Sequence, residues 1–175
     1  SKSLLLEFNE FYVGRDYNAE TGYVPRTDFV QINPKATLKF FPKKGPVEYH
    51  GFLTEADVFY LPSDMTLTDR KISAGYMFQF KNRSHLDLSN NLWHVMLRKN
   101  YDPTNIRNLY LPAGSVYDWY EFAAKYTSDN SRMLKYILNS GYGTYFNGRR
   151  FFAEGNFNYR FQPYGSISLI YSYND

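Results

Sequence analysis

The sequence of 175 residues contains no cysteine, so neither disulfide bonds nor cysteine-ligated metals are expected to hold its fold together. Its 20 basic and 17 acidic residues leave a formal net charge of +3 without any basic run, which argues against nucleic acid as a partner. Its longest apolar runs, such as Val58 to Leu61, are far shorter than the roughly 18 residues of a membrane-spanning helix. The first residues also lack the basic and then apolar pattern of a signal peptide. The short apolar runs do not exclude transmembrane β-strands, because such strands carry apolar residues only at alternate positions.

Aromatic residues are abundant instead, with 18 Tyr, 15 Phe and 2 Trp making up 20% of the chain. Aromatic side chains favour β-strands. The length fits one domain, and no Pro/Ser-rich linker divides residues 1–175. The composition therefore predicts a single all-β domain.

Strict alternation of apolar and polar residues is clearest from Arg150 to Gln162, where the two sets fall on opposite faces of a strand. Asn147-Gly148 just before it predicts a hairpin, with both residues central in a type I′ turn. After the break at Pro163-Tyr164-Gly165, alternation resumes, so the last forty residues read as a three-stranded meander. The apolar positions of the first of these strands are Phe151, Ala153, Gly155, Phe157, Tyr159 and Phe161.

The same alternation recurs over residues 30–40 and 71–81, and turn clusters separate the runs, giving about eight or nine strands. One segment, 118–139, also shows helical spacing, but its aromatic content favours a strand. The turn clusters lie at 42–46, 62–64, 81–84, 102–105 and 127–130.

Alternation alone does not separate a membrane barrel, with its apolar face toward lipid, from a soluble β-sandwich or ligand-binding barrel with that face in a core. Two features favour the membrane barrel. The polar faces mix charges and amides, as in a hydrated lumen. Aromatic residues gather near strand ends, as in an interfacial girdle. These pairs are Phe11-Tyr12, Phe40-Phe41, Phe59-Tyr60, Tyr145-Phe146 and Tyr171/Tyr173.

Motifs distributed along almost the whole chain resemble a Bacteroidota-type outer-membrane β-barrel family of unknown function. The full-length members of that family join an N-terminal carbohydrate-binding module, similar to family 9, to a large C-terminal barrel. The matching motifs are Asp16 to Phe29, Tyr101-Asp102-Pro103-Thr104, Leu111 to Ser115, Ser128-Asp129 with Arg132, Gly143 to Gly148, and Tyr159 to Tyr164. The resemblance implies a bacterial outer-membrane location and a chain that corresponds to part of the C-terminal barrel. A closed eight-stranded barrel is the alternative, and the family supplies no catalytic residues.

Five charged residues are the candidates for a ligand site or lumen lining: Arg26, Asp28, Arg150, Glu154 and Arg160. In the Val24-Pro25-Arg26-Thr27-Asp28 motif, Arg26 and Asp28 either grip a polar ligand or, as we favour, hold the loop through an ion pair between them or with another carboxylate. Asp129 and Arg132 are expected to form a turn cap and a local ion pair.

Glu154, between Arg150 and Arg160 on one strand, suggests a ladder of lumen salt bridges. A glycosidase would need a second carboxylate that the sequence does not place. His50, His85 and His94 show no metal-ligand spacing, and no cofactor is expected. Basic residues on the polar faces suggest a cationic lumen wall, with charge balance by acidic residues as the alternative. These basic residues are Lys35, Lys39, Lys71, Lys81, Arg150 and Arg160.

The sequence thus predicts a non-enzymatic outer-membrane β-barrel segment that takes part in transport or surface handling of glycans or other polar nutrients. Its expected partners are membrane lipid, a glycan or other polar solute, and other outer-membrane proteins. The alternative is a soluble β-sandwich that binds carbohydrate through aromatics such as Trp93 or Trp119.

Overall fold

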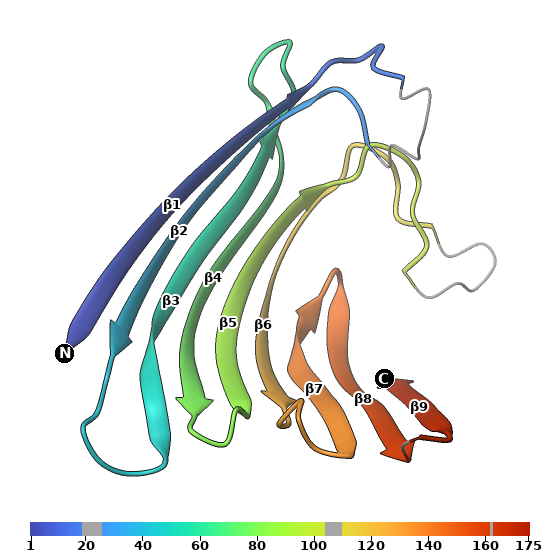
Figure 1. Cartoon of the computed structure of the whole chain (residues 1–175). Coiled ribbons are helices and arrows are strands. Elements are labelled where there is room, and N and C mark those ends of the chain that lie inside the picture. Colours follow the sequence, from blue (N-terminus) through green and yellow to red (C-terminus); the bar gives the residue numbers. More distant parts are fainter. Residues whose placement is uncertain (19–25, 104–109, 162) are drawn as a thin grey trace.

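In a computed structural model, which describes residues 1–18, 26–103, 110–161 and 163–175, the protein is one antiparallel sheet of nine strands. Each strand pairs with the next along the chain, so the sheet is a meander in the order β1 to β9 (Figure 1). The strands are β1 (Lys2–Val13), β2 (Phe29–Phe40), β3 (Val47–Tyr60), β4 (Leu67–Phe80), β5 (His85–Met96), β6 (Val116–Thr127), β7 (Leu134–Tyr145), β8 (Gly148–Phe161) and β9 (Gly165–Asn174).

The described residues contain no helix, and therefore none that could cross a membrane. The all-β meander expected from the sequence is confirmed. In the ambiguous segment 118–139, the aromatic residues up to Tyr126 lie in the strand β6, which covers Val116–Thr127. This is the strand that the aromatic content predicted. The three-stranded meander at the end of the chain corresponds to β7, β8 and β9. The Gln162 end of the predicted strand, Val24-Pro25, and part of the 102–105 turn lie outside the described residues.

The β7–β8 turn differs from the prediction by one residue. Tyr145 pairs with Gly148, so Phe146 and Asn147 are the central residues, rather than Asn147 and Gly148. Phe146 has a positive φ of 49° and Asn147 does not, which fits a type II′ turn and not type I′. The ring of Phe146 packs at a tilt of 33° against Trp119, with 4.9 Å between centroids, and contacts Tyr117 edge to face at 5.2 Å. A positive φ is unfavourable for phenylalanine, and these ring contacts form in the turn that requires it. The identities of the turn residues do not predict these contacts.

The two ends of the sheet differ in their connections. One end carries the long loops 14–28 and 97–115 and the turns 61–66 and 146–147. The other end carries only the short connections 41–46, 81–84, 128–133 and 162–164 (Figure 1). We call these the long-loop end and the short-turn end.

Candidate functional site

The register assigns each strand residue to one of two faces. Residues paired across neighbouring strands share a face, so Leu6, Ala36 and Thr54 lie on one and Glu7, Lys35 and Glu55 on the other. The same pairing can be followed from strand to strand up to β9. The face of Leu6 is rich in aliphatic and aromatic side chains, and the face of Glu7 carries most of the charged and amide side chains. We call them the apolar face and the polar face.

The polar face is the more crowded and is concave. A Cβ added to Gly51 or Gly143, which lie on this face, would stand 2.0 Å from the carbonyl oxygen of Leu38 or Tyr120 in the neighbouring strand. Such an approach occurs where a sheet folds toward the side on which the missing side chain would stand. The buried strand side chains also lie on this face, apart from Thr68 at the start of β4. They are Thr37, Met77, Asn91 and Phe152.

The apolar face is convex and exposed. Leu6 exposes 70% of its surface, and Phe52, Leu92 and Phe122, in the middle of their strands, each expose more than half. Large exposed apolar surfaces mark contacts with another apolar phase or partner. In this sheet, therefore, the polar side chains are the sheltered ones and the apolar side chains are the uncovered ones.

Rings form a band across the apolar face near the short-turn end. Contacts between rings run from β2 to β4 and again from β6 to β8, with centroid distances of 5.5 to 6.2 Å. The members are Phe40, His50, Phe78, Tyr126, Tyr136 and Phe157. The sequence predicted aromatic clusters at strand ends, four of them as pairs of neighbouring residues and the fifth as Tyr171 with Tyr173. Alternation places only one of each neighbouring pair within a strand on the apolar face, for example Tyr12 and not Phe11.

Hydrogen bonds between side chains cross the polar face from strand to strand. The Gln31 amide donates to the carboxylate of Asp57 at 2.6 Å. The Ser73 hydroxyl donates to the Asn91 amide oxygen at 2.7 Å, and the Asn91 amide in turn donates to Glu121 at 3.4 Å. Such bonds satisfy polar groups on a crowded surface.

Arg26 folds back over the polar face at the long-loop end. Its guanidinium contacts the Asp69 carboxylate at 2.6 Å and donates to the Thr68 hydroxyl at 2.7 Å. The same group lies over the rings of Phe59, at 4.8 Å, and Phe29, at 5.8 Å. These contacts fit the favoured role of Arg26, which is to hold the loop through an ion pair. The carboxylate in that pair belongs to Asp69 on β4.

Asp28 does not pair with Arg26. Its carboxylate lies 3.6 Å from Arg98 and 3.7 Å from Arg15, and its φ is 63°. Arg98 also donates to the carbonyl of Thr27 at 3.2 Å. Asp28 therefore joins the two long loops, β1–β2 and β5–β6, at their bases.

The expected salt-bridge ladder of Arg150, Glu154 and Arg160 does not form. Four residues on a strand span about 13 Å, so each side chain meets a neighbouring strand or turn instead. The Asn139 amide donates to Glu154 at 3.1 Å, Arg150 donates to Asn174 at 3.0 Å, and Arg160 donates to the carbonyl of Asn130 at 3.2 Å.

The polar face is not cationic overall. Its strands carry seven basic side chains, Lys35, Lys39, Lys71, Lys125, Lys135, Arg150 and Arg160, and seven acidic ones, Glu7, Glu55, Asp57, Asp69, Asp87, Glu121 and Glu154. The expected cationic wall is therefore wrong, because residues of both signs alternate onto this face. Lys81 lies in a turn.

A row of aromatic rings, with a cation at each end, crosses the polar face. Lys71 lies 4.8 Å above the Trp93 ring, which stacks on Trp119 at 5.8 Å. Trp119 meets Tyr145 at 5.6 Å, and Arg150 lies 5.1 Å from the Tyr145 ring. The buried indole nitrogen of Trp93 has no hydrogen-bond partner among the described residues. The sequence presents the two tryptophans as separate candidates, and only the strand register shows that they are neighbours.

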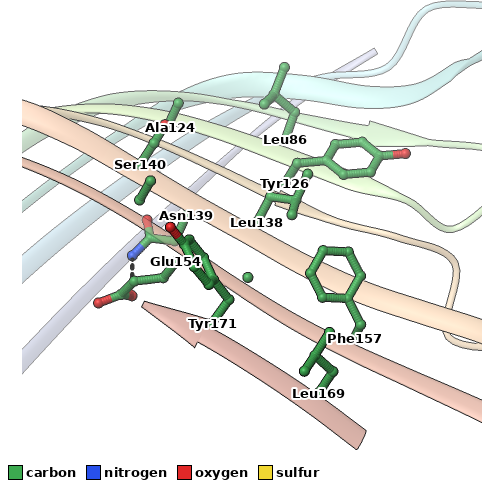
Figure 2. Close-up of a pocket in the computed structure, with 12 residues that line it drawn as sticks. Leu86, Ala124, Tyr126, Leu138, Asn139, Ser140, Glu154, Phe157, Leu169 and Tyr171 are labelled. Atoms are coloured by element: carbon green, nitrogen blue, oxygen red, sulfur yellow. Dashed lines mark hydrogen bonds between the residues drawn. The ribbon is translucent and has the colours of Figure 1, made fainter. Parts of the chain in front are cut away.

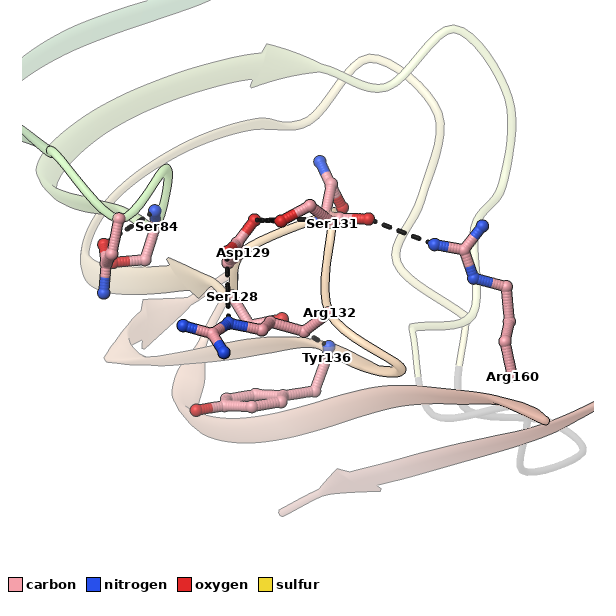
Figure 3. A network of polar contacts seen from close by, with 9 residues as sticks. Ser84, Ser128, Asp129, Ser131, Arg132, Tyr136 and Arg160 are labelled. Atoms are coloured by element: carbon pink, nitrogen blue, oxygen red, sulfur yellow. Dashed lines mark hydrogen bonds and ion pairs between the residues drawn. The ribbon is translucent and has the colours of Figure 1, made fainter. Parts of the chain in front are cut away.

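A polar network at the short-turn end surrounds Asp129 (Figure 3). The backbone and hydroxyl of Ser131 both donate to its carboxylate at 2.8 Å, and Arg132 lies 3.4 Å away. The hydrogen bonds from Ser131, and then the charges of Arg132 and Arg83, lower the pKa of Asp129. The expected turn cap and local ion pair are confirmed.

Each of the three histidines is hydrogen-bonded to an aspartate or a tyrosine side chain. His85 pairs with Asp87 at 2.7 Å, His94 pairs with Asp118 at 2.8 Å, and His50 shares a hydrogen bond with the Tyr76 hydroxyl. Within the described ranges, no three histidine or acidic residues group as metal ligands.

Comparison with protein-family models, with curated proteins and with solved structures found no match for this chain.

Proposed function

We propose that this sheet is part of the wall of a bacterial outer-membrane β-barrel, with its convex apolar face against lipid and its concave polar face along a water-filled passage. The observation that carries the proposal is the distribution of exposure, with hydrogen-bonded polar groups crowded on the inner side of the curve and large apolar side chains exposed outside. A barrel wall in lipid needs this arrangement. The band of rings near the short-turn end supports the proposal, because aromatic residues gather where lipid meets water.

The role that this arrangement supports best is non-enzymatic transport or surface handling of polar nutrients, including glycans. The polar face carries balanced charge, many amides and hydroxyls, and an aromatic row. Such a surface suits neutral, polyhydroxylated solutes better than ions of one sign. Other outer-membrane proteins remain proposed partners in this handling.

The edges of the sheet place a condition on the proposal. With nine antiparallel strands, β1 and β9 run in the same direction, and each pairs on one side only among the described residues. Unpaired backbone groups cost several kcal/mol each in lipid. We therefore expect further strands, from this protein or another, to pair with both edges. An odd number of them would close an antiparallel ring.

The first test is whether the intact protein partitions into outer membranes and changes its mobility on a gel after heating, as closed barrels do. The second test compares Phe122→Arg, on the apolar face, with Asn156→Arg, an exposed position of the polar face. In lipid, arginine near the bilayer midplane costs about 2–4 kcal/mol on the lipid side and little on the lumen side. We expect Phe122→Arg to reduce assembly and Asn156→Arg to leave it unchanged. A protein in the soluble fraction with both variants folded would overturn the proposal.

The second candidate function is a soluble β-sandwich that binds carbohydrate on its concave face. The stacked pair Trp93 and Trp119 favours it, because concave sugar sites combine rings with polar groups. In that case a second sheet would cover the apolar face, and the protein would remain soluble without detergent.

A further inference from the structure

A groove of about 600 Å³ runs along the apolar face over β5 to β9 (Figure 2). Its floor is formed where the register brings small residues side by side, with Ala124 paired to Ser140 and Ser140 to Ala153. Larger side chains stand around this floor. They are Leu86, Tyr126, Leu138, Phe157, Leu169 and Tyr171.

The chemistry of the groove suits a hydrocarbon chain. Its walls are aliphatic and aromatic, and its two polar residues from the opposite face, Asn139 and Glu154, are hydrogen-bonded to each other at 3.1 Å. Only the hydroxyl groups of Ser140, Tyr126 and Tyr171 could replace the water that a polar ligand would lose here, and lost hydrogen bonds to water are costly. An alkyl chain gains about 0.8 kcal/mol for each methylene that it buries.

Two arginines lie in the turns next to this groove. Arg83 is in the β4–β5 turn, three residues before Leu86, and Arg132 is in the β6–β7 turn that follows Tyr126 and Thr127. Arg132 exposes 75% of its side chain beside Asp129 (Figure 3), and the positive charge of Arg83 also acts on Asp129. The two turns are neighbours at this end of the groove, because His85, just after the first turn, pairs with Thr127, just before the second.

The charges of the two ends of the sheet indicate which headgroup fits. The described connections at the short-turn end hold five basic residues, Lys43, Lys44, Lys81, Arg83 and Arg132, and one acidic residue, Asp129. Those at the long-loop end hold four basic residues, Arg15, Arg26, Arg98 and Lys99, and four acidic ones, Asp16, Asp28, Asp64 and Asp102. Basic clusters at a membrane surface attract anionic lipids.

We propose that the groove and the pair Arg83 and Arg132 form a binding site for one anionic phospholipid. An acyl chain lies between Tyr126, Leu138 and Phe157, and the phosphate lies beside the two guanidinium groups. The inference rests on the proposed membrane location, since the groove meets lipid only there. It adds a specific site and a lipid class to that location.

Native mass spectrometry of the intact protein in detergent tests the site, with palmitoyl-oleoyl phosphatidylglycerol as the probe and the matching phosphatidylcholine as the control. We expect one phosphatidylglycerol to be retained in preference to phosphatidylcholine. The double variant Arg83→Gln, Arg132→Gln should weaken retention by about fivefold per arginine, the equivalent of ~1 kcal/mol per basic residue near an anionic lipid. The matched control is Lys43→Gln, Lys44→Gln, which removes the same charge from another turn at the same end.

The groove is tested by Ala153→Leu, which narrows its floor, against Ala74→Leu, an exposed position of the apolar face on β4. Ala153→Leu should weaken retention by about fourfold for each methylene it displaces. Ala74→Leu should leave retention unchanged.

Equal retention of the two lipids, equal effects in either matched pair, or displacement of the lipid by excess inorganic phosphate would overturn the site. The last result would indicate a site for a free anion. These outcomes leave the membrane location intact if the protein still partitions into outer membranes and shifts on heating. A soluble protein without a heat shift would overturn the proposed function itself.

Discussion

Arg26 makes several contacts at once at the end of the β1–β2 loop. Its guanidinium joins Asp69, Thr68 and the rings of Phe59 and Phe29, and it retains only about a quarter of its exposure. A lysine in its place could keep the ion pair but not the fork and the stacking. Its role is therefore to position the end of the β1–β2 loop over the polar face.

We predict that Arg26→Ala lowers the free energy of unfolding by about 1–3 kcal/mol, because it leaves the Asp69 carboxylate half-buried without its cation. Arg15→Ala is the matched control, since Arg15 is largely exposed and 3.7 Å from Asp28, and such pairs contribute about 0–1 kcal/mol. Unfolding in urea, followed by tryptophan fluorescence, gives both values. Equal midpoints for the two variants would contradict the role assigned to Arg26.

Asp129 is predicted to make stability depend on pH at the acidic end. Its pKa is lowered in the folded protein by the hydrogen bonds from Ser131, so its contribution is fully present above the unfolded value near 3.8 and is lost as pH falls through the lower folded value. Asp129→Ala should therefore be destabilised at neutral pH and lose less stability than the natural protein below pH of about 4. The urea midpoints of both proteins, measured from neutral to acidic pH, would show this difference in stability. Parallel curves for the two proteins would exclude this coupling.

Among the strands, the glycines of the polar face set how tightly the sheet curves. Gly143 on β7 and Gly148 on β8 flank the same turn, but only Gly143 faces a neighbouring carbonyl oxygen at 2.0 Å from its would-be Cβ. At Gly148 the nearest such atom is 3.8 Å away. The two positions therefore separate the effect of curvature from the general cost of losing a glycine.

We predict that Gly143→Ala destabilises the protein by at least about 2 kcal/mol, because the strand must move away from Tyr120 to admit a methyl group. Gly148→Ala should change the free energy of unfolding by less than about 0.5 kcal/mol. Urea titration of both variants measures the difference. An unchanged free energy of unfolding for Gly143→Ala would contradict the role of this glycine in the curvature of the sheet.

The β7–β8 turn illustrates how packing sets the end of an element. Asn-Gly is the strongest hairpin signal in a short sequence, yet the turn is centred one residue earlier. Moving a two-residue turn by one position shifts the register of β7 and β8 by two residues, which leaves Arg150 and Glu154 on the polar face. Alternation therefore permits both turns, and the observed one is the turn in which the Phe146 ring packs against Trp119 and Tyr117.

For the whole molecule, the asymmetry of the two ends predicts an orientation. Outer-membrane barrels place long loops outside the cell and short turns in the periplasm. Trypsin added to intact cells should therefore cut after Arg98 or Lys99 in the β5–β6 loop and spare Lys43 and Lys44. Cleavage at Lys43 or Lys44 should require permeabilised cells, and peptide mass spectrometry identifies each site. Cleavage at the lysines in intact cells would reverse the orientation.

The alternation of apolar and polar residues was enough to predict the class of fold and the residues on each face. A period of two assigns every residue of a strand to one side, which is why about eight or nine strands, the strand β6 and the polar character of Arg150 and Glu154 could all be predicted. The ion pair of Asp129 with Arg132 was also predictable, because it closes within one turn of the chain.

The side chains that meet across strands could not be predicted from this alternation. Arg26 reaches Asp69, Asn139 reaches Glu154, and Trp93 stacks on Trp119, and each of these contacts depends on register and curvature. Alternation fixes the face of a residue but leaves its neighbours on the next strand open, since any register shifted by two residues keeps the same pattern. The groove and its neighbouring arginines arise in the same way, from small residues that become neighbours only when β6, β7 and β8 align.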